Sequence, residues 1–342
     1  VQMKARKGGA NDARLLAVVT TRKNQQGRLY RLPTNADIKA VCDATSEIEK
    51  RGQSWKGPLS LVPNEPLPLM SGVFNVPIYG HTDWGTLFTA RQALSISTIA
   101  RLVVDCGATL NMAEDNTMST ALKTCLSLAM DRQADYTTSL CSWHLTGEKL
   151  NHTYGRQALG MIWDFAEVCP FANGSGNFEG AFSWVADVCE RVARSTIVQG
   201  HVERASATAH PLPDNSAKLF ATDPPYYNAV PYADLSDFFY VWLRRTLTPE
   251  HPDLFTEDTS PKDHELCEMA GWDPLRYSNK NAQWYEQQMG MAMADGRRVL
   301  SPDGVGIVVF AHKSTSGWEA QLQAMIQGGW VISGSWPIDA EM

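Results

Sequence analysis

Residues 222–227 read Thr-Asp-Pro-Pro-Tyr-Tyr and combine a carboxylate, two prolines and aromatic rings in one short segment. This combination suits chemistry on an exocyclic amino group of a nucleobase, whose nitrogen is a poor nucleophile because its lone pair is delocalised into the ring. Two acceptors that hold the two N–H bonds can pull this nitrogen towards tetrahedral geometry and aim the lone pair at an electrophilic methyl group. Asp223 would provide one acceptor and the backbone carbonyl of Pro224 the other. Pro225 would keep the turn rigid, and the ring of Tyr226 would stack on a base lifted out of the double helix.

A second interpretation of the same segment is purely structural. Asp-Pro-Pro can close a strand as an Asx-type turn, with both tyrosines packed into the core. The preceding residues, 217–222, have the pattern of a buried strand, so Asp223 is expected at a strand's carboxyl end. Open α/β sheets bind ligands at the carboxyl ends of their strands, which favours the chemical interpretation.

The second half of the chain alternates predicted strands with predicted helices. The pattern predicts strands at 196–202, 217–222, 305–310 and 330–338, helices at 182–193, 234–247, 284–300 and 318–327, a turn at 301–304 and a loop over 248–280. This order is typical of a mostly parallel sheet with helices on both faces, which is the α/β fold class. We assign residues 181–342 to this α/β region.

Four polar or aromatic residues near the predicted strand ends are candidates for contact with nucleic acid. Tyr227 and Asn228 follow the proline turn directly, and His312 and Lys313 follow the predicted strand at 305–310. The imidazole and the ammonium group could meet a phosphate or the base. The alternative is that they belong to a solvated strand end.

Asp234 and Asp237 are three residues apart and therefore share one face of a predicted helix. They could shape a pocket beside the proline turn, although acids near a helix N-terminus commonly stabilise the helix dipole. Three histidines and one cysteine of the second half lack the spacing of metal ligands, so no metal is assigned to them: His201, His210, His264 and Cys267.

The first half of the chain has a different character, and we assign residues 1–180 to a mixed, largely helical region. Two apolar segments, 15–19 and 28–32, flank Asn24-Gln-Gln-Gly27 and predict an N-terminal β-hairpin. Pro33-Thr34 would cap a helix over 36–49. A Pro- and Gly-rich loop is expected over 51–82, followed by helices at 84–106, 115–138 and 153–168.

Composition indicates an ordinary globular protein of 342 residues, with 44% hydrophobic and 20% charged side chains. No apolar run reaches the ~20 residues that a membrane span needs. The seven cysteines are scattered and never form a C-x-x-C pair, which favours a reducing cytoplasm over a secreted disulfide scaffold. The whole chain carries a net charge of −7, yet residues 1–31 sum to +7. This basic segment could touch phosphate locally or form a solvated hairpin.

Thr222-Asp-Pro-Pro-Tyr226 resembles motif IV of the amino-group DNA methyltransferases that use S-adenosylmethionine. Beyond the motif, the chain resembles the adenine-specific DNA methylases that carry a zinc-ribbon segment. The phrases that carry this resemblance are GRLYRLPT (27–34), WDFAE (163–167), ATDPPYYNAVPYADLSDFFYVWL (221–243), FAHK (310–313) and SWPI (335–338). The resemblance implies a partial Rossmann-like methyltransferase sheet, S-adenosylmethionine as cofactor, DNA as partner, and Asp223, Pro224, Pro225 and Tyr226 as the catalytic set.

The chain departs from this family in its methyl-donor loop. The family has a glycine-rich donor loop and the zinc ribbon upstream of the part that this chain resembles, so we expect the chain to be a C-terminal portion whose donor loop comes from a missing N-terminal part. The nearest candidate within the chain is residues 169–176, with Phe171, Gly174 and Gly176 as possible donor contacts. A surface loop that opens the next helix is the other interpretation. A non-catalytic nucleic-acid-binding fragment, or a methyltransferase for RNA or protein amino groups, therefore stays open as an alternative function.

Overall fold

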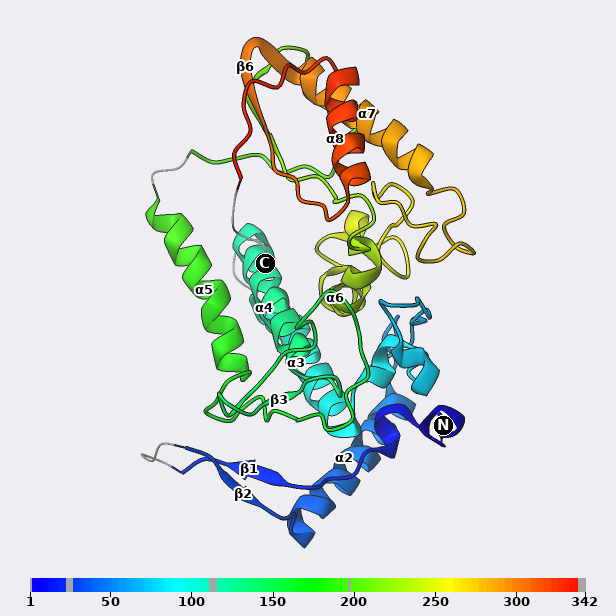
Figure 1. The fold of residues 1–342 in the computed structure, drawn as a ribbon. Coiled ribbons are helices and arrows are strands. Elements are labelled where there is room, and N and C mark those ends of the chain that lie inside the picture. The colour runs from blue at the N-terminus through cyan, green and yellow to red at the C-terminus, as the bar shows by residue number, and fades with distance from the viewer. Residues whose placement is uncertain (1, 23–26, 111–115, 196–197, 338–342) are drawn as a thin grey trace. The chain divides into compact units, whose positions relative to one another are not determined.

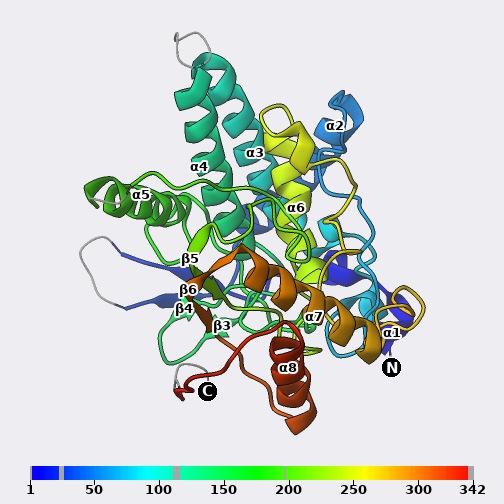
Figure 2. The ribbon, with the colours of Figure 1, turned by 90° about the horizontal axis from the view of Figure 1, so that it is seen from above.

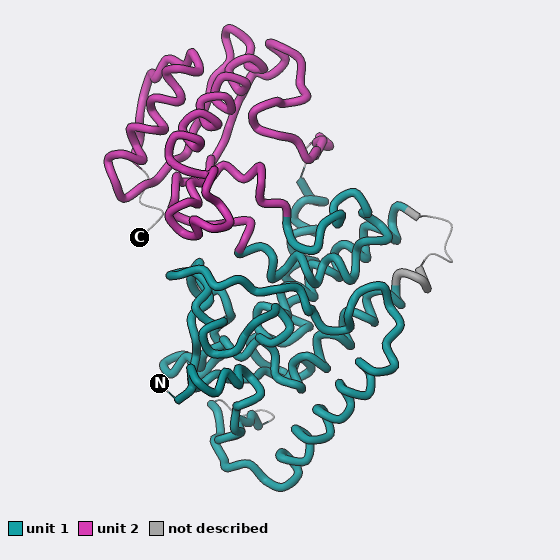
Figure 3. The backbone as a smooth tube through the Cα atoms, turned by 90° about the vertical axis from the view of Figure 1, so that its right-hand side faces the viewer, with its two compact units in different colours: residues 1–197, 235–260 teal, residues 198–234, 261–342 magenta. Residues whose placement is uncertain are grey.

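The computed structural model describes residues 2–22, 27–110, 116–195 and 198–337 (Figure 1). It is a mixed α/β structure, with about 44% helix and 11% strand. The chain divides into two compact units (Figure 3): unit 1 comprises residues 1–197 and 235–260, and unit 2 comprises residues 198–234 and 261–342. The sequence-based boundary after residue 180 falls inside a helix, α5 (Phe178–Arg194), which groups with the helices before it.

The elements of unit 1 are mostly helical. Its helices are α1 (Gln2–Arg6), α2 (Asn35–Ser54), α3 (Ala90–Leu110), α4 (Asn116–Asp135) and α5, and its short strands are β1 (Val18–Thr20), β2 (Leu29–Arg31), β3 (Trp143–His144) and β4 (Lys149–Leu150). Helix α6 (Tyr232–Leu247) crosses from unit 2 into unit 1 at residue 235. None of the described helices has both the length and the apolar composition that a membrane crossing requires.

The N-terminal hairpin and the helix after it form as predicted. β1 and β2 pair antiparallel, with Val19 opposite Tyr30, while residues 24–26 of the predicted turn lie outside the described residues. Helix α2 begins after Thr34, whose hydroxyl accepts a hydrogen bond from the Asp37 amide, and the Asp37 carboxylate accepts one from the Thr34 amide at 2.7 Å. This reciprocal capping box satisfies two backbone donors at the helix start.

The helical prediction for the middle of unit 1 is only partly correct. The helix expected from residue 84 opens as a 3-10 turn, Trp84–Leu87, and α3 begins at residue 90, where Thr89 and Gln92 exchange backbone–side-chain hydrogen bonds. The predicted helix at 153–168 is wrong. Its backbone instead bonds to distant segments, since Leu159 N donates to Val73 O and Ala166 N donates to Cys141 O, both at 2.8 Å.

Unit 2 is built on a parallel pair of strands. β5 (Ala217–Thr222) pairs with β6 (Leu300–Val308), and α7 (Ala282–Val299) leads directly into β6 (Figure 2). α8 (Thr315–Gln327) follows. The parallel pairing confirms the strand–helix–strand order expected from the sequence. The predicted turn at 301–304 lies inside β6, at the point where the register shifts between Ala217 and Leu219.

Two strands expected in unit 2 do not form in its described residues. Residues 198–202 pair with no strand, and residues 330–337 run without strand structure, while residues 196–197 and 338 of these two predictions lie outside the described residues. Trp330 accounts for the second difference, because its indole N–H donates to Met293 O at 2.8 Å and its ring packs on Phe220 at 5.5 Å. These contacts hold the segment against α7 and β5 at its first residue, outside the strand ladder.

Helices cover one face of the β5–β6 sheet in unit 2. Tyr285, Met289 and Met293 of α7 and Ala320 and Ala324 of α8 form a buried cluster, against which Val308 of β6 packs. On the other face Leu219, Val305 and Ile307 are 57%, 61% and 51% exposed. The expectations of a fully buried β5 and of helices on both faces are therefore wrong for the described residues.

Candidate functional site

The Asp-Pro-Pro-Tyr segment lies at the carboxyl end of β5, as the strand pattern predicted. β5 ends at Thr222, whose carbonyl accepts a hydrogen bond from Val309 N at 2.9 Å, just beyond β6. The ladder thus continues to the residue before Asp223 and anchors the start of the segment. The chain then leaves the sheet as a turn.

Hydrogen bonds inside and around the turn determine which of its carbonyls is available. Tyr227 N and the hydroxyl of Tyr285 both donate to Pro225 O, each at 2.9 Å. Tyr227 has a φ of 55°, a left-handed backbone conformation that is unusual for a tyrosine. Of the two proline carbonyls, Pro224 O receives no hydrogen bond from a described residue, so it is available to accept one from a ligand.

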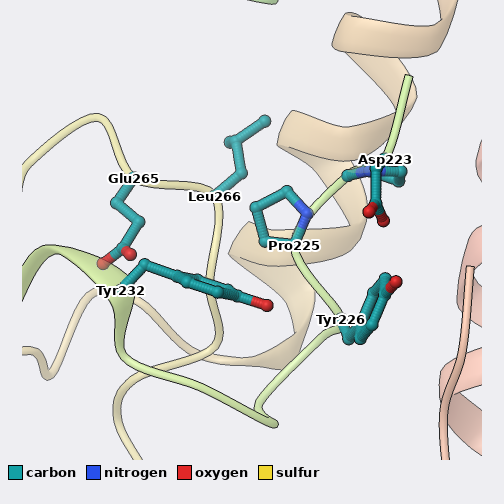
Figure 4. Close-up of a pocket in the computed structure, with 7 residues that line it drawn as sticks. Asp223, Pro225, Tyr226, Tyr232, Glu265 and Leu266 are labelled. Atoms are coloured by element: carbon teal, nitrogen blue, oxygen red, sulfur yellow. The ribbon is translucent and has the colours of Figure 1, made fainter. Parts of the chain in front are cut away.

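Asp223 is exposed, and within the described part of the chain its carboxylate has neither an ion pair nor a hydrogen bond. It opens on a cavity of about 480 Å³, within the size range of small-molecule sites. Seven residues line this cavity: Asp223, Pro224, Pro225, Tyr226, Tyr232, Glu265 and Leu266. Figure 4 shows the Asp223 carboxylate and the Tyr226 ring on one side of Pro225, with Tyr232 and Glu265 on the other. A carboxylate, a carbonyl and aromatic rings therefore meet at one hollow.

The wall formed by Glu265 and Leu266 belongs to a loop that polar contacts hold in place. The Glu265 carboxylate accepts a hydrogen bond from Ala233 N at 2.8 Å. Burial raises the pKa of Glu265 above its ordinary value. Lys280 is fully buried, and its ammonium group donates to the backbone carbonyls of Lys262 and Glu265. The loop is thereby tied at two points next to the cavity.

Aromatic and polar side chains surround the turn on its other side. The Tyr226 ring meets Phe310 edge-on, with ring centroids 5.5 Å apart. His312 lies 5.8 Å from the Tyr227 ring, and its Nε2 is 3.4 Å from the Asn228 side-chain oxygen. Three of the four predicted nucleic-acid contacts, Tyr227, Asn228 and His312, thus come together.

Lys313 follows His312 directly, and its side chain is exposed. In the described residues its ammonium group has no ion pair or hydrogen bond. A cation in this position is available to a phosphate.

Asp234 and Asp237 do not line the cavity. Asp234 is fully buried and accepts hydrogen bonds from Arg276 and from the Tyr277 hydroxyl, both at 2.9 Å. Asp237 accepts from the backbone amide and hydroxyl of Ser260, at 2.8 and 2.6 Å. Both acids anchor loops to α6, which is a structural role other than the helix-dipole role considered for them; only Asp234 lies in the first turn of α6.

The candidate donor loop at 169–176 lies in unit 1, as turns that precede α5. Asn177 caps this helix by accepting a hydrogen bond from Gly180 N at 3.0 Å. Phe171 is 75% exposed, Gly174 faces open space, and Gly176 has a φ of 83° beside Tyr136. The nearest preceding strand is β4, at residues 149–150. This placement fits a surface loop that opens α5 and does not fit a donor loop that follows a sheet strand.

Sequence reasoning missed Tyr232, Glu265 and Leu266 as cavity residues. Tyr232 lies inside the 23-residue stretch at 221–243 that carried the family resemblance, so its nearness to the motif was a usable signal. Glu265 sits in a polar loop without any local pattern that marks it. Among the described residues, no group of three or more His, Cys, Asp or Glu side chains could hold a metal ion.

Comparisons of the chain with protein-family models, with curated proteins and with solved structures found no match. The functional conclusion therefore depends on the geometry of the cavity and on the chemistry of the residues around it.

Proposed function

We propose that this protein is an S-adenosylmethionine-dependent DNA methyltransferase that acts on the exocyclic amino group of adenine. One observation carries the proposal. Two acceptors on consecutive residues, the exposed Asp223 carboxylate and the Pro224 carbonyl, have no donor among the described residues and border a cavity of about 480 Å³. An amino group supplies two N–H donors, which match these two acceptors.

The residues of the turn have distinct tasks in this reaction. Asp223 accepts one N–H bond of the adenine amino group and Pro224 O accepts the other, which directs the nitrogen lone pair away from the ring. Pro225 fixes the turn, and its own carbonyl is held by Tyr227 and Tyr285. The Tyr226 ring offers a stacking surface to the extruded base.

S-adenosylmethionine supplies an electrophilic methyl group on a sulfonium. With the donor bound, the nitrogen lone pair that Asp223 and Pro224 O direct would bond to that methyl carbon as the carbon–sulfur bond breaks, and the Asp223 carboxylate or water would accept the proton that the nitrogen releases. Residues 169–176 do not fit the donor, because they form an exposed turn before α5. We therefore assign donor binding to another part of the protein.

In this proposal, the surface next to the Asp-Pro-Pro-Tyr turn contacts the DNA. His312 and Asn228 lie side by side, and the exposed ammonium group of Lys313 is free to pair with a phosphate. We assign Tyr227, Asn228, His312 and Lys313 to this contact. This contact positions the DNA backbone, while the target base binds in the cavity.

The poor fit of residues 169–176 to a methyl donor favours a second candidate function. In that case the chain binds nucleic acid through the same turn and catalyses no methyl transfer. Calorimetry of the full-length protein, including the part to which donor binding is assigned, with S-adenosylmethionine and with DNA separates the two, because only the enzyme binds the donor.

The decisive experiment measures transfer of a labelled methyl group from S-adenosylmethionine to adenine in DNA. We expect the wild-type protein to be active and Asp223→Ala to lose roughly 100-fold or more of the rate, because the substitution removes an acceptor from the transition state. Asp303→Ala is the matched control, since Asp303 is an exposed carboxylate of unit 2 whose partner is Lys218. Equal rates for the two variants contradict the proposed role of Asp223.

A further inference from the structure

Two cysteines of unit 1 face each other across a helix pair. Cys125 is on α4 and Cys189 is on α5, and their sulfur atoms are 3.9 Å apart although 64 residues separate them in sequence. The two helices pack side by side (Figure 1). The other five cysteines of the chain differ from this pair: Cys141 and Cys267 are buried, and Cys42, Cys106 and Cys169 are exposed.

The two sulfur atoms are near enough to form a disulfide after a small movement. A disulfide needs sulfur atoms about 2.05 Å apart, so each of the two sulfurs has to move by only about 1 Å. A second contact keeps α5 against α4, because the guanidinium carbon of Arg132 lies 3.8 Å from the ring centroid of Trp184. The thiols are therefore held near each other by packing that does not depend on them.

The two thiols differ in their access to solvent. Cys189 is exposed, whereas Cys125 is partly buried. Burial, together with the neighbouring thiol, raises the pKa of Cys125 above its ordinary value. A small oxidant from solvent therefore reaches Cys189 first. Cys125 is less accessible and would act as the resolving cysteine.

We propose that Cys189 and Cys125 form an oxidisable dithiol that hydrogen peroxide converts into an intramolecular disulfide. The thiolate of Cys189 attacks one peroxide oxygen, the O–O bond breaks, and Cys189 becomes a sulfenic acid, while the hydroxide that leaves takes up the proton released by the Cys189 thiol and becomes water. The Cys125 thiol then attacks the Cys189 sulfur, the S–S bond forms, and the sulfenic hydroxyl leaves as a second water. One peroxide is reduced to two waters, two thiols become one disulfide, and an external thiol reverses the change.

The disulfide would bind α5 covalently to α4. Without it, α5 depends on non-covalent contacts, and Val188 and Val192 leave 57% and 63% of their surface exposed. A cross-link over a span of 64 residues restricts the unfolded chain strongly. The oxidised protein should therefore unfold at a temperature roughly 5–10 °C higher than the reduced protein.

The test treats the reduced protein with hydrogen peroxide, quenches with catalase, blocks free thiols by alkylation and maps the peptides by mass spectrometry. We expect a peptide that links Cys125 to Cys189 in the monomer, and two fewer free thiols than the seven of the reduced chain. Cys189→Ser should abolish the link. Cys125→Ser should leave Cys189 as a sulfenic acid that dimedone traps.

Cys169→Ser is the control, because it removes an exposed cysteine that lies outside the pair. This variant should form the link at the wild-type rate and show the same rise in melting temperature. The proposal is overturned when peroxide oxidises Cys189 to the sulfinic acid without forming the link, or when intermolecular disulfides of other cysteines form instead.

Discussion

The buried carboxyl group of Asp131 offers a quantitative test of the packing in unit 1. Asp131 lies on α4, its side chain is 6% exposed, and its Oδ1 has no hydrogen-bond partner among the described residues. Burial by itself raises the pKa of this carboxyl well above the ordinary value of 3.8. We predict that Asp131→Asn raises the free energy of unfolding at neutral pH, because the folded wild type must either keep Asp131 protonated or bury an unpaired charge, whereas asparagine is neutral at every pH.

The pH dependence gives the magnitude of this effect. Because the pKa of Asp131 in the folded chain is raised above its unfolded value, the contribution of Asp131 to stability is complete below the unfolded pKa and is lost as the pH rises through the folded pKa. Asparagine has the same size as the protonated aspartic acid, is also uncharged, and would likewise have no hydrogen-bond partner at this position. Wild type and Asp131→Asn should therefore be similarly stable at about pH 4. Each pH unit between the two pKa values then favours the variant by up to about 1.4 kcal/mol.

Urea unfolding of wild type and Asp131→Asn at a series of pH values from about 4.5 to about 7.5 measures this difference. Asp187→Asn is the control, because Asp187 is an exposed carboxylate on α5 of the same unit. It should change the free energy of unfolding by less than about 0.5 kcal/mol at every pH. A stability difference between wild type and Asp131→Asn that does not grow with pH would refute the assignment of Asp131 as a buried, unpaired acid.

Three further predictions concern unit 2. Asp234→Asn should lower the free energy of unfolding by about 1.5–3 kcal/mol, because it removes a buried charge that bonds to Arg276, whereas Asp223→Asn should change it by less than about 0.5 kcal/mol. Equal losses in urea unfolding would show that one of these two acids is misplaced. Tyr285→Phe removes a hydroxyl that holds the motif turn, so it should cost about 1 kcal/mol and lower the methyl-transfer rate several-fold; an unchanged rate would exclude this positioning role. Glu265→Gln should stabilise the protein increasingly as the pH rises above 4.5, because the raised pKa means that the wild type loses stability on ionisation. Unfolding curves that keep a constant separation across pH would contradict this.

Local sequence signals predicted the elements whose determinants lie within a few residues. The capping box of Thr34 and Asp37 fixes the start of α2 without help from distant segments. The strand pattern at 217–222 and the proline turn after it likewise predicted β5 and the residue at its end. These predictions succeeded because propensity, capping and turn chemistry act over one or two helical turns.

Long-range contacts decided the elements that the sequence mispredicted. Residues 153–168 have a helical pattern, but their backbone groups bond to Val73 and Cys141 instead. Trp330 begins an apolar run that reads as a strand, yet its ring packs against Phe220 and its N–H bonds to Met293 O. Contacts with distant segments outweigh local secondary-structure preference here, because the spacing of apolar residues does not determine which surface they pack against.

For the candidate site, the sequence by itself determined the chemical groups, namely a carboxylate, a rigid carbonyl and an aromatic ring at residues 223–226. Only the tertiary structure decided which of these groups is available, because the hydroxyl of Tyr285 takes the carbonyl of Pro225 and leaves that of Pro224 without a described donor. It also brought Glu265 to the cavity wall and placed Asp234 in the interior. A sequence specifies donors and acceptors, whereas their pairing and burial depend on which distant segments fold against them.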